Sequence, residues 1–199
     1  MSINVCNDRS MASITSLPSG VSGGSLVLLE TQPASSSSNI SFTSNIDSTY
    51  KEYIFKFIDI HPSAEYAHFS FQADTGTNTN YNQTITSAAW TSTSNEGGTE
   101  AIINYQTASD QAQGTGFQYL TDQLEADNDS CAAGTLHIFD PSNTTFVKHF
   151  YSVCSLDYGG RSYQFHVGGY VNTTAAVTAT QFTLGSQWDA GTVKLYGVA

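Results

Sequence analysis

The tripeptide Asp74-Thr75-Gly76 is the segment of this sequence that comes nearest to a catalytic motif. Proteases with paired aspartates use such a tripeptide to bring two carboxylates close enough to share a proton. The chain has a single copy, so this chemistry would need a two-fold dimer. A polar run, Thr77-Asn78-Thr79-Asn80, follows directly, and it favours the tip of a turn over a catalytic strand end.

The histidines could provide metal ligands, and the chain has five: His61, His68, His137, His149 and His166. None has the H-x-H or H-E-x-x-H spacing that places two imidazoles on one metal. Three of them, His68, His137 and His166, occupy polar positions of alternating segments, which favours solvated strand faces. In a trimer, one histidine near the axis could still form a three-fold ring.

Carboxylates at alternate positions, Glu125, Asp127 and Asp129, could provide oxygen ligands for Ca²⁺. The glycine and the distal glutamate of an EF-hand loop are missing, which favours a solvated acidic loop. We predict no metal site and no cofactor, and the sequence leaves open whether this loop binds Ca²⁺.

Nucleophilic catalysis also lacks its usual signals. No G-x-S-x-G elbow is present, and no glycine-rich phosphate loop follows a strand. A glycosidase needs paired carboxylates, but the predicted strands have few charged residues. We therefore predict that the chain is not an enzyme, and a depolymerase is kept only as a minor alternative.

Three aromatic residues in or beside predicted loops, Tyr81, Trp90 and Trp188, could bind sugars. An aromatic ring stacks on the C–H groups of a sugar, while neighbouring amides bond its hydroxyls. The two tryptophans could instead close the ends of the core. Both readings remain open at this point.

The composition limits the class of protein. The chain has 199 residues, of which 39% are hydrophobic and only 12% are charged, with a net charge of −11. One domain with a sizeable core is the expectation for this length. Nucleic-acid binding requires a basic face, and no run of basic residues exists, so we exclude nucleic acid as a partner.

Cysteine content and hydropathy bear on location. The three cysteines, Cys6, Cys131 and Cys154, are an odd number without metal-type spacing, so buried free thiols are expected. The longest apolar stretch is too short to cross a bilayer, and Met1–Ser10 lacks the pattern of a signal peptide. We expect neither membrane insertion nor the usual secretory route.

Alternating polarity predicts an all-β fold. Residues 1–24 lack periodicity and are interpreted as an extended N-terminal arm, with one sandwich domain over residues 25–199. Strict alternation predicts half-buried strands at Tyr66–Phe71 and Tyr163–Val167. By contrast, Tyr53–Ile58 is apolar on both parities and is expected to be covered on both faces, either by a second sheet or by a subunit partner. Ser109–Glu125 is expected to hold at most a short helix or an irregular excursion.

Seven further strands are expected, and close backbone approach or a bulge is expected at Gly168-Gly169. Short strands with polar turns predict an antiparallel, jelly-roll-like β-sandwich. Trimerisation would cover the exposed edges of such a fold, so a homotrimer is expected. The seven strands are Ser25–Thr31, Ile40–Thr43, Thr84–Trp90, Gly134–Phe139, Thr145–Cys154, Ala176–Leu184 and Thr192–Val198.

Several blocks carry a resemblance to a known family: Asn45–Lys51 through Pro62, Phe139–His149, Gly168-Gly169-Tyr170, and above all Asp189–Gly197 with its closing G-T-V-K-L-Y-G. Over roughly residues 25–199 the chain is similar to fibre- or decoration-type virion structural proteins from cyanophages and other aquatic tailed phages. The resemblance implies a place on the virion after assembly in the bacterial cytoplasm, and it implies no catalytic residues.

The expected function is therefore that of a structural protein on the exterior of a tailed-phage particle, as a short fibre, spike or capsid decoration. Residues 1–24 would attach it to other virion proteins. The alternative is a receptor-binding module that recognises host cell-surface polysaccharide through Tyr81, Trp90 and Trp188. The sequence does not distinguish capsid, neck and tail.

Overall fold

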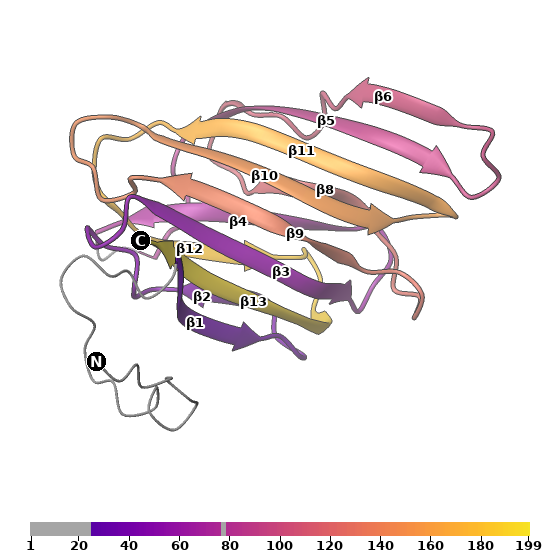
Figure 1. Cartoon of the computed structure of the whole chain (residues 1–199), viewed down its shortest axis with the longest axis horizontal. Helices are drawn as coiled ribbons and strands as arrows, with labels where there is room; N and C mark the ends of the chain where they lie inside the picture. The colour runs from indigo at the N-terminus through magenta and orange to yellow at the C-terminus, as the bar shows by residue number, and fades with distance from the viewer. Residues whose placement is uncertain (1–24, 77–78) are drawn as a thin grey trace, which may run out of the picture.

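A computed structural model describes residues 25–76 and 79–199, and the predicted arm of residues 1–24 lies outside this described part. The described residues form thirteen β-strands in two antiparallel sheets that pack face to face (Figure 1). No helix occurs among them. The all-β sandwich predicted from the alternating polarity is confirmed.

Eight of the strands have the order of a jelly roll. In chain order they alternate between the sheets, except that the fourth and fifth are neighbours in the same sheet, and the first pairs with the last, which winds two interlocked Greek keys. In the large sheet four lie adjacent in the order β1 (Leu26–Pro33), β13 (Trp188–Val198), β3 (Glu52–Pro62) and β9 (Ala132–Phe139). The small sheet has the order β2 (Asn39–Phe42), β12 (Val177–Thr183), β4 (Ala67–Thr75) and β8 (Gln118–Leu124).

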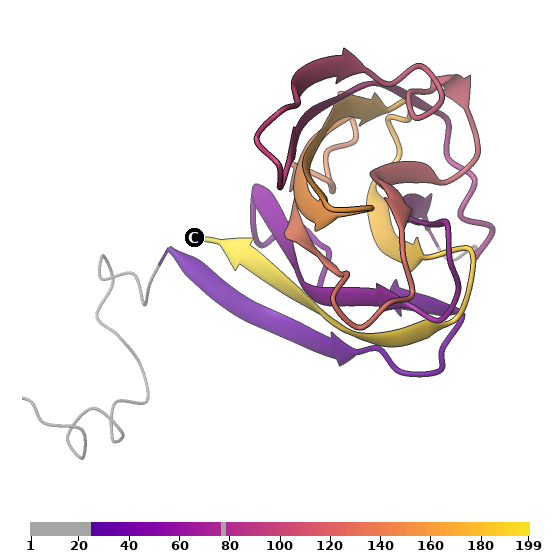
Figure 2. The same ribbon diagram turned by 90° about the vertical axis from the view of Figure 1, so that its right-hand side faces the viewer.

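Five inserted strands extend the large sheet beyond β9. Next to β9 lie β10 (Lys148–Asp157), β11 (Arg161–Val171), β5 (Ile85–Asn95) and β6 (Ala101–Tyr105), and the short β7 (Ala112–Gly114) also pairs with β5. The extended sheet curves, and its two edge strands β1 and β6 lie on opposite sides of the molecule (Figure 2).

Phenylalanine rings fill the space between the two sheets. Phe182 of β12 is fully buried, and several rings surround it at centroid distances of 5.1 to 6.5 Å. Most of these pairs are edge-to-face, an arrangement that adds to the stability gained from burial. The rings in contact with Phe182 are Phe42, Phe55, Phe57, Phe69 and Phe71.

Two expectations about single segments need correction. The segment Ser109–Glu125 forms the strands β7 and β8 where at most a short helix or an irregular excursion was expected, because Gly114 and Gly116 break any helical run and β8 pairs with β4. For β3 the correction concerns only a second sheet, since no second layer of described residues covers its outer face, whereas cover by a subunit partner stays a prediction. Its outward Ile54 is shielded instead by Tyr196 and His137, its register partners on β13 and β9.

The glycine pair Gly168-Gly169 was predicted to allow a close backbone approach, and this is confirmed at Gly169. A Cβ atom there would collide with the Thr86 carbonyl oxygen and with Ser87 on the adjacent strand β5. At Gly168, on the opposite face, a Cβ would meet nothing within 4 Å. The inserted strands therefore depend on one of these glycines for packing and not on the other.

Candidate binding surfaces

Of the three aromatic residues proposed for sugar contact, Trp188 and Tyr81 have almost no exposed surface. Trp188 is 0% exposed and lies edge-to-face with Phe69 at 5.5 Å, so it has the core-closing role that the sequence left open. Tyr81 is 7% exposed, and its backbone N–H donates to Asp74 Oδ2 at 3.0 Å. Neither ring is available to a ligand in this conformation.

Trp90 differs, because it lies in the middle of β5 on the outer face of the large sheet and is 40% exposed. Its cross-strand partner on β11 is His166. The two rings stack face to face, with centroids 3.8 Å apart and planes 2° from parallel. Partial burial lowers the pKa of His166 because it disfavours the imidazolium form.

A second stacked pair lies on the neighbouring strands of the same face. Tyr151 of β10 and His137 of β9 are register partners with ring centroids 4.3 Å apart. His137 Nδ1 is 2.6 Å from a carboxylate oxygen of Glu52 on β3. This contact holds the imidazole in place, so the exposed Tyr151 ring has a fixed neighbour.

On the small sheet a third histidine repeats the pattern. His68 of β4 stacks on Tyr119 of β8 at 4.4 Å, beside an open hollow of about 310 Å³ that Tyr66 and Phe117 also line. The prediction that these three histidines occupy outer strand faces is confirmed. The sequence did not indicate that each would stack on an aromatic ring, because cross-strand register brings these partners together from distant segments.

Asp74, the aspartate of the catalytic-like tripeptide, is fully buried and organises a loop. Its carboxylate accepts the backbone N–H groups of Thr75 and Tyr81, at 2.8 and 3.0 Å. These two hydrogen bonds give Asp74 a structural role, which agrees with the turn predicted from the sequence. Residues 77 and 78 of this loop lie outside the described part of the chain.

The acidic loop forms bonds within the protein. Glu125 accepts the backbone N–H of Gly159 at 3.2 Å, and the Asp127 carbonyl oxygen lies 3.1 Å from His61 Nε2. Within residues 25–76 and 79–199, no cluster of three or more acidic, histidine or cysteine side chains has the geometry of a metal site.

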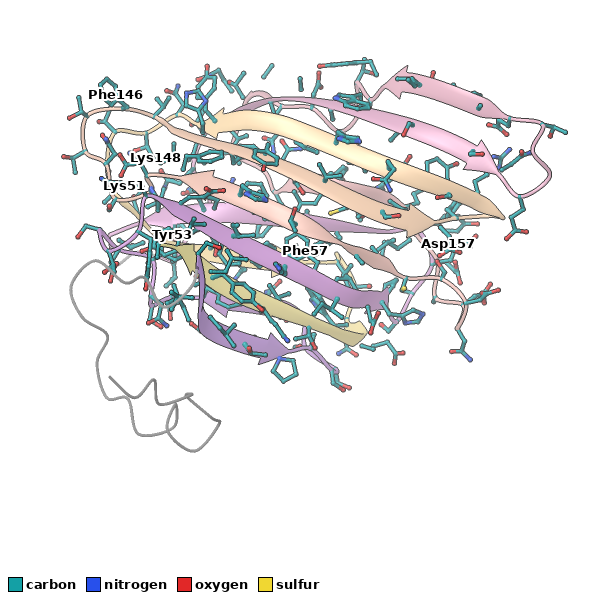
Figure 3. The ribbon with its side chains drawn as sticks, in the orientation of Figure 1. Lys51, Tyr53, Phe57, Phe146, Lys148 and Asp157 are labelled. Carbon is teal, nitrogen blue, oxygen red and sulfur yellow. The ribbon has the colours of Figure 1, made fainter. Side chains whose placement is uncertain are left out.

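Lys148 is a fully buried cation at the end of β10. Its ammonium group donates to the carbonyl oxygens of Phe146 and Thr173, at 2.9 and 3.1 Å. Burial lowers its pKa, and the more distant charge of Asp140 partly opposes this effect. Phe146 and Lys148 lie at one end of the sheet, and Asp157 lies at the other end of β10 (Figure 3). The hydrogen bonds of Lys148 connect the loops that contain Phe146 and Thr173, so Lys148 has a structural role.

The two edges of the large sheet expose apolar side chains. All five residues of β6 are exposed, with Ile103 at 75% and its neighbour Ile102 on the opposite face. On β1 the outward Leu28 is 53% exposed. Neither Ala101–Tyr105 nor Leu26–Leu29 contains a charged residue. Strand β6 is therefore an uncharged apolar edge that is ready to pair with another chain, whereas β1 also contains Glu30, Pro33 and a register irregularity between Leu28 and Glu30.

Comparison with family models, with curated proteins and with solved structures gives no match. No helix among the described residues has the length and apolar content needed to cross a membrane. The functional argument therefore depends on the surfaces described above.

Proposed function

We propose that this chain is a structural protein on the exterior of a tailed-phage particle, where neighbouring protein chains cover its edge strands. The similarity of residues 25–199 to virion proteins of aquatic tailed phages, with its closing G-T-V-K-L-Y-G block, motivates this assignment. The exposed apolar strand β6 is the observation that carries it.

The properties of β6 favour a subunit of an assembly over a protein that acts alone. Side chains on both faces of the strand are exposed, and its outer backbone edge has no strand partner among the described residues. A freely soluble protein usually protects such an edge with a lysine, a proline or a bulge, and Ala101–Tyr105 has none of these. A partner strand would pair the backbone and cover Ile102 and Ile103 together.

A homotrimer is the proposed oligomer. Three copies can bring β6 of one copy near the exposed β1 edge of the next, and a closed ring leaves no edge free. The arm of residues 1–24 then attaches the trimer to other virion proteins.

The test uses a charged substitution at the edge. Ile103→Lys places a charge on the exposed strand without removing core packing, and Phe146→Lys makes the same change on an exposed loop residue. Both proteins should fold. We expect the Ile103→Lys protein to be absent from purified particles and to sediment as a monomer, while the Phe146→Lys protein is incorporated as a trimer.

Deletion of residues 1–24 tests the arm in the same assay and should leave a folded trimer that does not join the particle. Normal incorporation of the Ile103→Lys protein would remove the role of β6. Particles that never contain the wild-type chain, as judged by electron cryomicroscopy or immunogold labelling, would overturn the proposed function itself.

A further inference from the structure

Between the strand ends, the outer face of the inserted strands has no Asp, Glu, Lys or Arg, in a protein with a net charge of −11, and the outward Asp157 lies at the end of β10. The other charged side chains of the outer face belong to the jelly-roll strands, such as Glu52, Lys56 and Lys194. Between the strand ends, the outward residues of the inserted strands are the following: His149, Tyr151, Val153 and Ser155 on β10; Ser162, Gln164, His166, Gly168 and Tyr170 on β11; Thr86, Ala88, Trp90, Ser92 and Ser94 on β5; and Ala101, Ile103 and Tyr105 on β6.

Trp90 is held so that one face of its indole is free. His166 covers the face toward β11. On the other side of Trp90, its register partner on β6 is Tyr105, whose hydroxyl donates to the Asp110 carboxylate at 2.7 Å. No ring contact joins Trp90 and Tyr105. The indole therefore has an immobilised position and an exposed surface, as a stacking platform requires.

Small residues separate this platform from the second stack. One outward position along from Trp90 on β5 lies Ala88, whose register partner on β11 is Gly168. Gly168 is in turn the register partner of Tyr151 on β10, and both Ala88 and Gly168 are exposed. Trp90 and Tyr151 lie two strands apart and one outward position apart along the sheet, which places them roughly 12 Å from each other. That separation suits a short oligosaccharide lying across the strands.

The chemistry between the rings favours a sugar over a protein. The polar groups next to Trp90 along the strands, Ser92 and Gln164, are a hydroxyl and an amide, which bond sugar hydroxyls well. Protein interfaces are depleted in serine at their core, whereas serines recur on this face. Carboxylates lie only at the margins of this face, where Asp110 and Glu52 bond Tyr105 and His137. Between them the outward side chains carry no formal charge, which matches a neutral polymer, and the face lacks the cations that would recognise phosphate or uronate groups.

We propose that the outer face of β10, β11 and β5 binds a neutral polysaccharide, with the Trp90–His166 and Tyr151–His137 stacks as two separate sugar-stacking positions. This site is on the sheet and not in the loops. It goes beyond the structural role, and it can be tested on the purified chain whether or not the protein belongs to a particle.

The test is affinity electrophoresis of the full-length protein in gels that contain a polysaccharide. The panel comprises dextran, an α-1,4-glucan, a β-mannan, a galactan and neutral polysaccharide extracted from the bacterial host, with alginate as an anionic comparison. The variants are Trp90→Ala and Tyr151→Ala. The matched control is Phe146→Ala, which removes an exposed aromatic ring from a loop at the end of the sheet.

We expect retardation by at least one neutral polymer, with affinity reduced about tenfold by either platform substitution and unchanged by the control. Unchanged urea-unfolding midpoints would show that the variants are folded. Three results would each overturn the proposal: no retardation by any neutral polymer, binding to alginate alone, or binding that survives both substitutions in one chain.

Discussion

Trp188 and Trp90 are the only tryptophans in the chain, and their surroundings predict opposite responses to substitution. Trp188 is fully buried among the core rings, and its indole Nε1 has no hydrogen-bond acceptor among the described residues. Trp90 is on the surface, stacked on one histidine. We expect Trp188 substitutions to report on stability and Trp90 substitutions to report on binding.

The magnitude at Trp188 follows from two opposing effects. Replacement by phenylalanine leaves about 40 Å³ unfilled, and at about 24 cal/mol per Å³ this cavity costs about 1 kcal/mol. The same change removes a buried N–H without a partner, which costs about 1 to 3 kcal/mol while it is present. The removed penalty equals or exceeds the cavity cost, so Trp188→Phe should leave the free energy of unfolding unchanged or raise it by up to about 2 kcal/mol.

Trp188→Ala removes the same N–H but leaves a far larger cavity, so it should lose about 3 to 5 kcal/mol. Urea unfolding followed by circular dichroism gives both values, with Trp90→Phe as the surface control, expected to lose below about 1 kcal/mol. A loss above about 2 kcal/mol for Trp188→Phe would refute the reasoning, because it would mean that the indole N–H is satisfied in the folded protein.

Two further predictions concern the inserted strands. Gly169→Ala should destabilise the protein by about 1 to 3 kcal/mol, because the added methyl group collides with β5. Gly168→Ala should change the free energy of unfolding by less than about 0.5 kcal/mol. Equal effects of the two substitutions in thermal unfolding would contradict the close approach at Gly169. The pKa of Lys148 is lowered in the folded protein. At pH values between the folded-state pKa and the ordinary lysine pKa, the unfolded chain therefore holds a proton that the folded chain has released. In this pH range the free energy of unfolding rises with pH. As the pH rises toward the ordinary lysine pKa of about 10.4, the wild-type protein should therefore gain stability relative to Lys148→Met, and a difference that is constant with pH would rule this out.

Much of the fold could be predicted from local pattern. Alternation of apolar and polar residues identifies β11 around Tyr163–Val167, because a strand with one face in the core exposes every second residue. The pattern is absent in β6, where neither face is buried and all five residues are exposed. It is also hidden in β8, whose buried Gln118 and Thr121 are polar and are paired by hydrogen bonds.

The binding face could be predicted only in part. Trp90 was selected as an aromatic residue beside a loop, but its position in the middle of a strand depends on the extension of β5 to Asn95. Its stacking partner His166 lies 76 positions later in the chain (166 − 90) and is brought next to it by the pairing of β5 with β11. Composition and periodicity do not specify such non-local register, so the structure was needed to find the platform.

The position of the inserted strands explains how assembly and sugar binding can coexist. Their inward side chains, such as Phe150 and Phe165, are buried in the shared core, so a role in folding explains why these residues are aromatic. The outward rings of Trp90 and Tyr151 gain little from folding, since both remain about half exposed. A strand added beside β6 would occupy the backbone edge of the sheet and cover Ile103, and it would leave the outer face of β10, β11 and β5 open. The two proposed interactions therefore use different surfaces of the same extension, and neither one prevents the other.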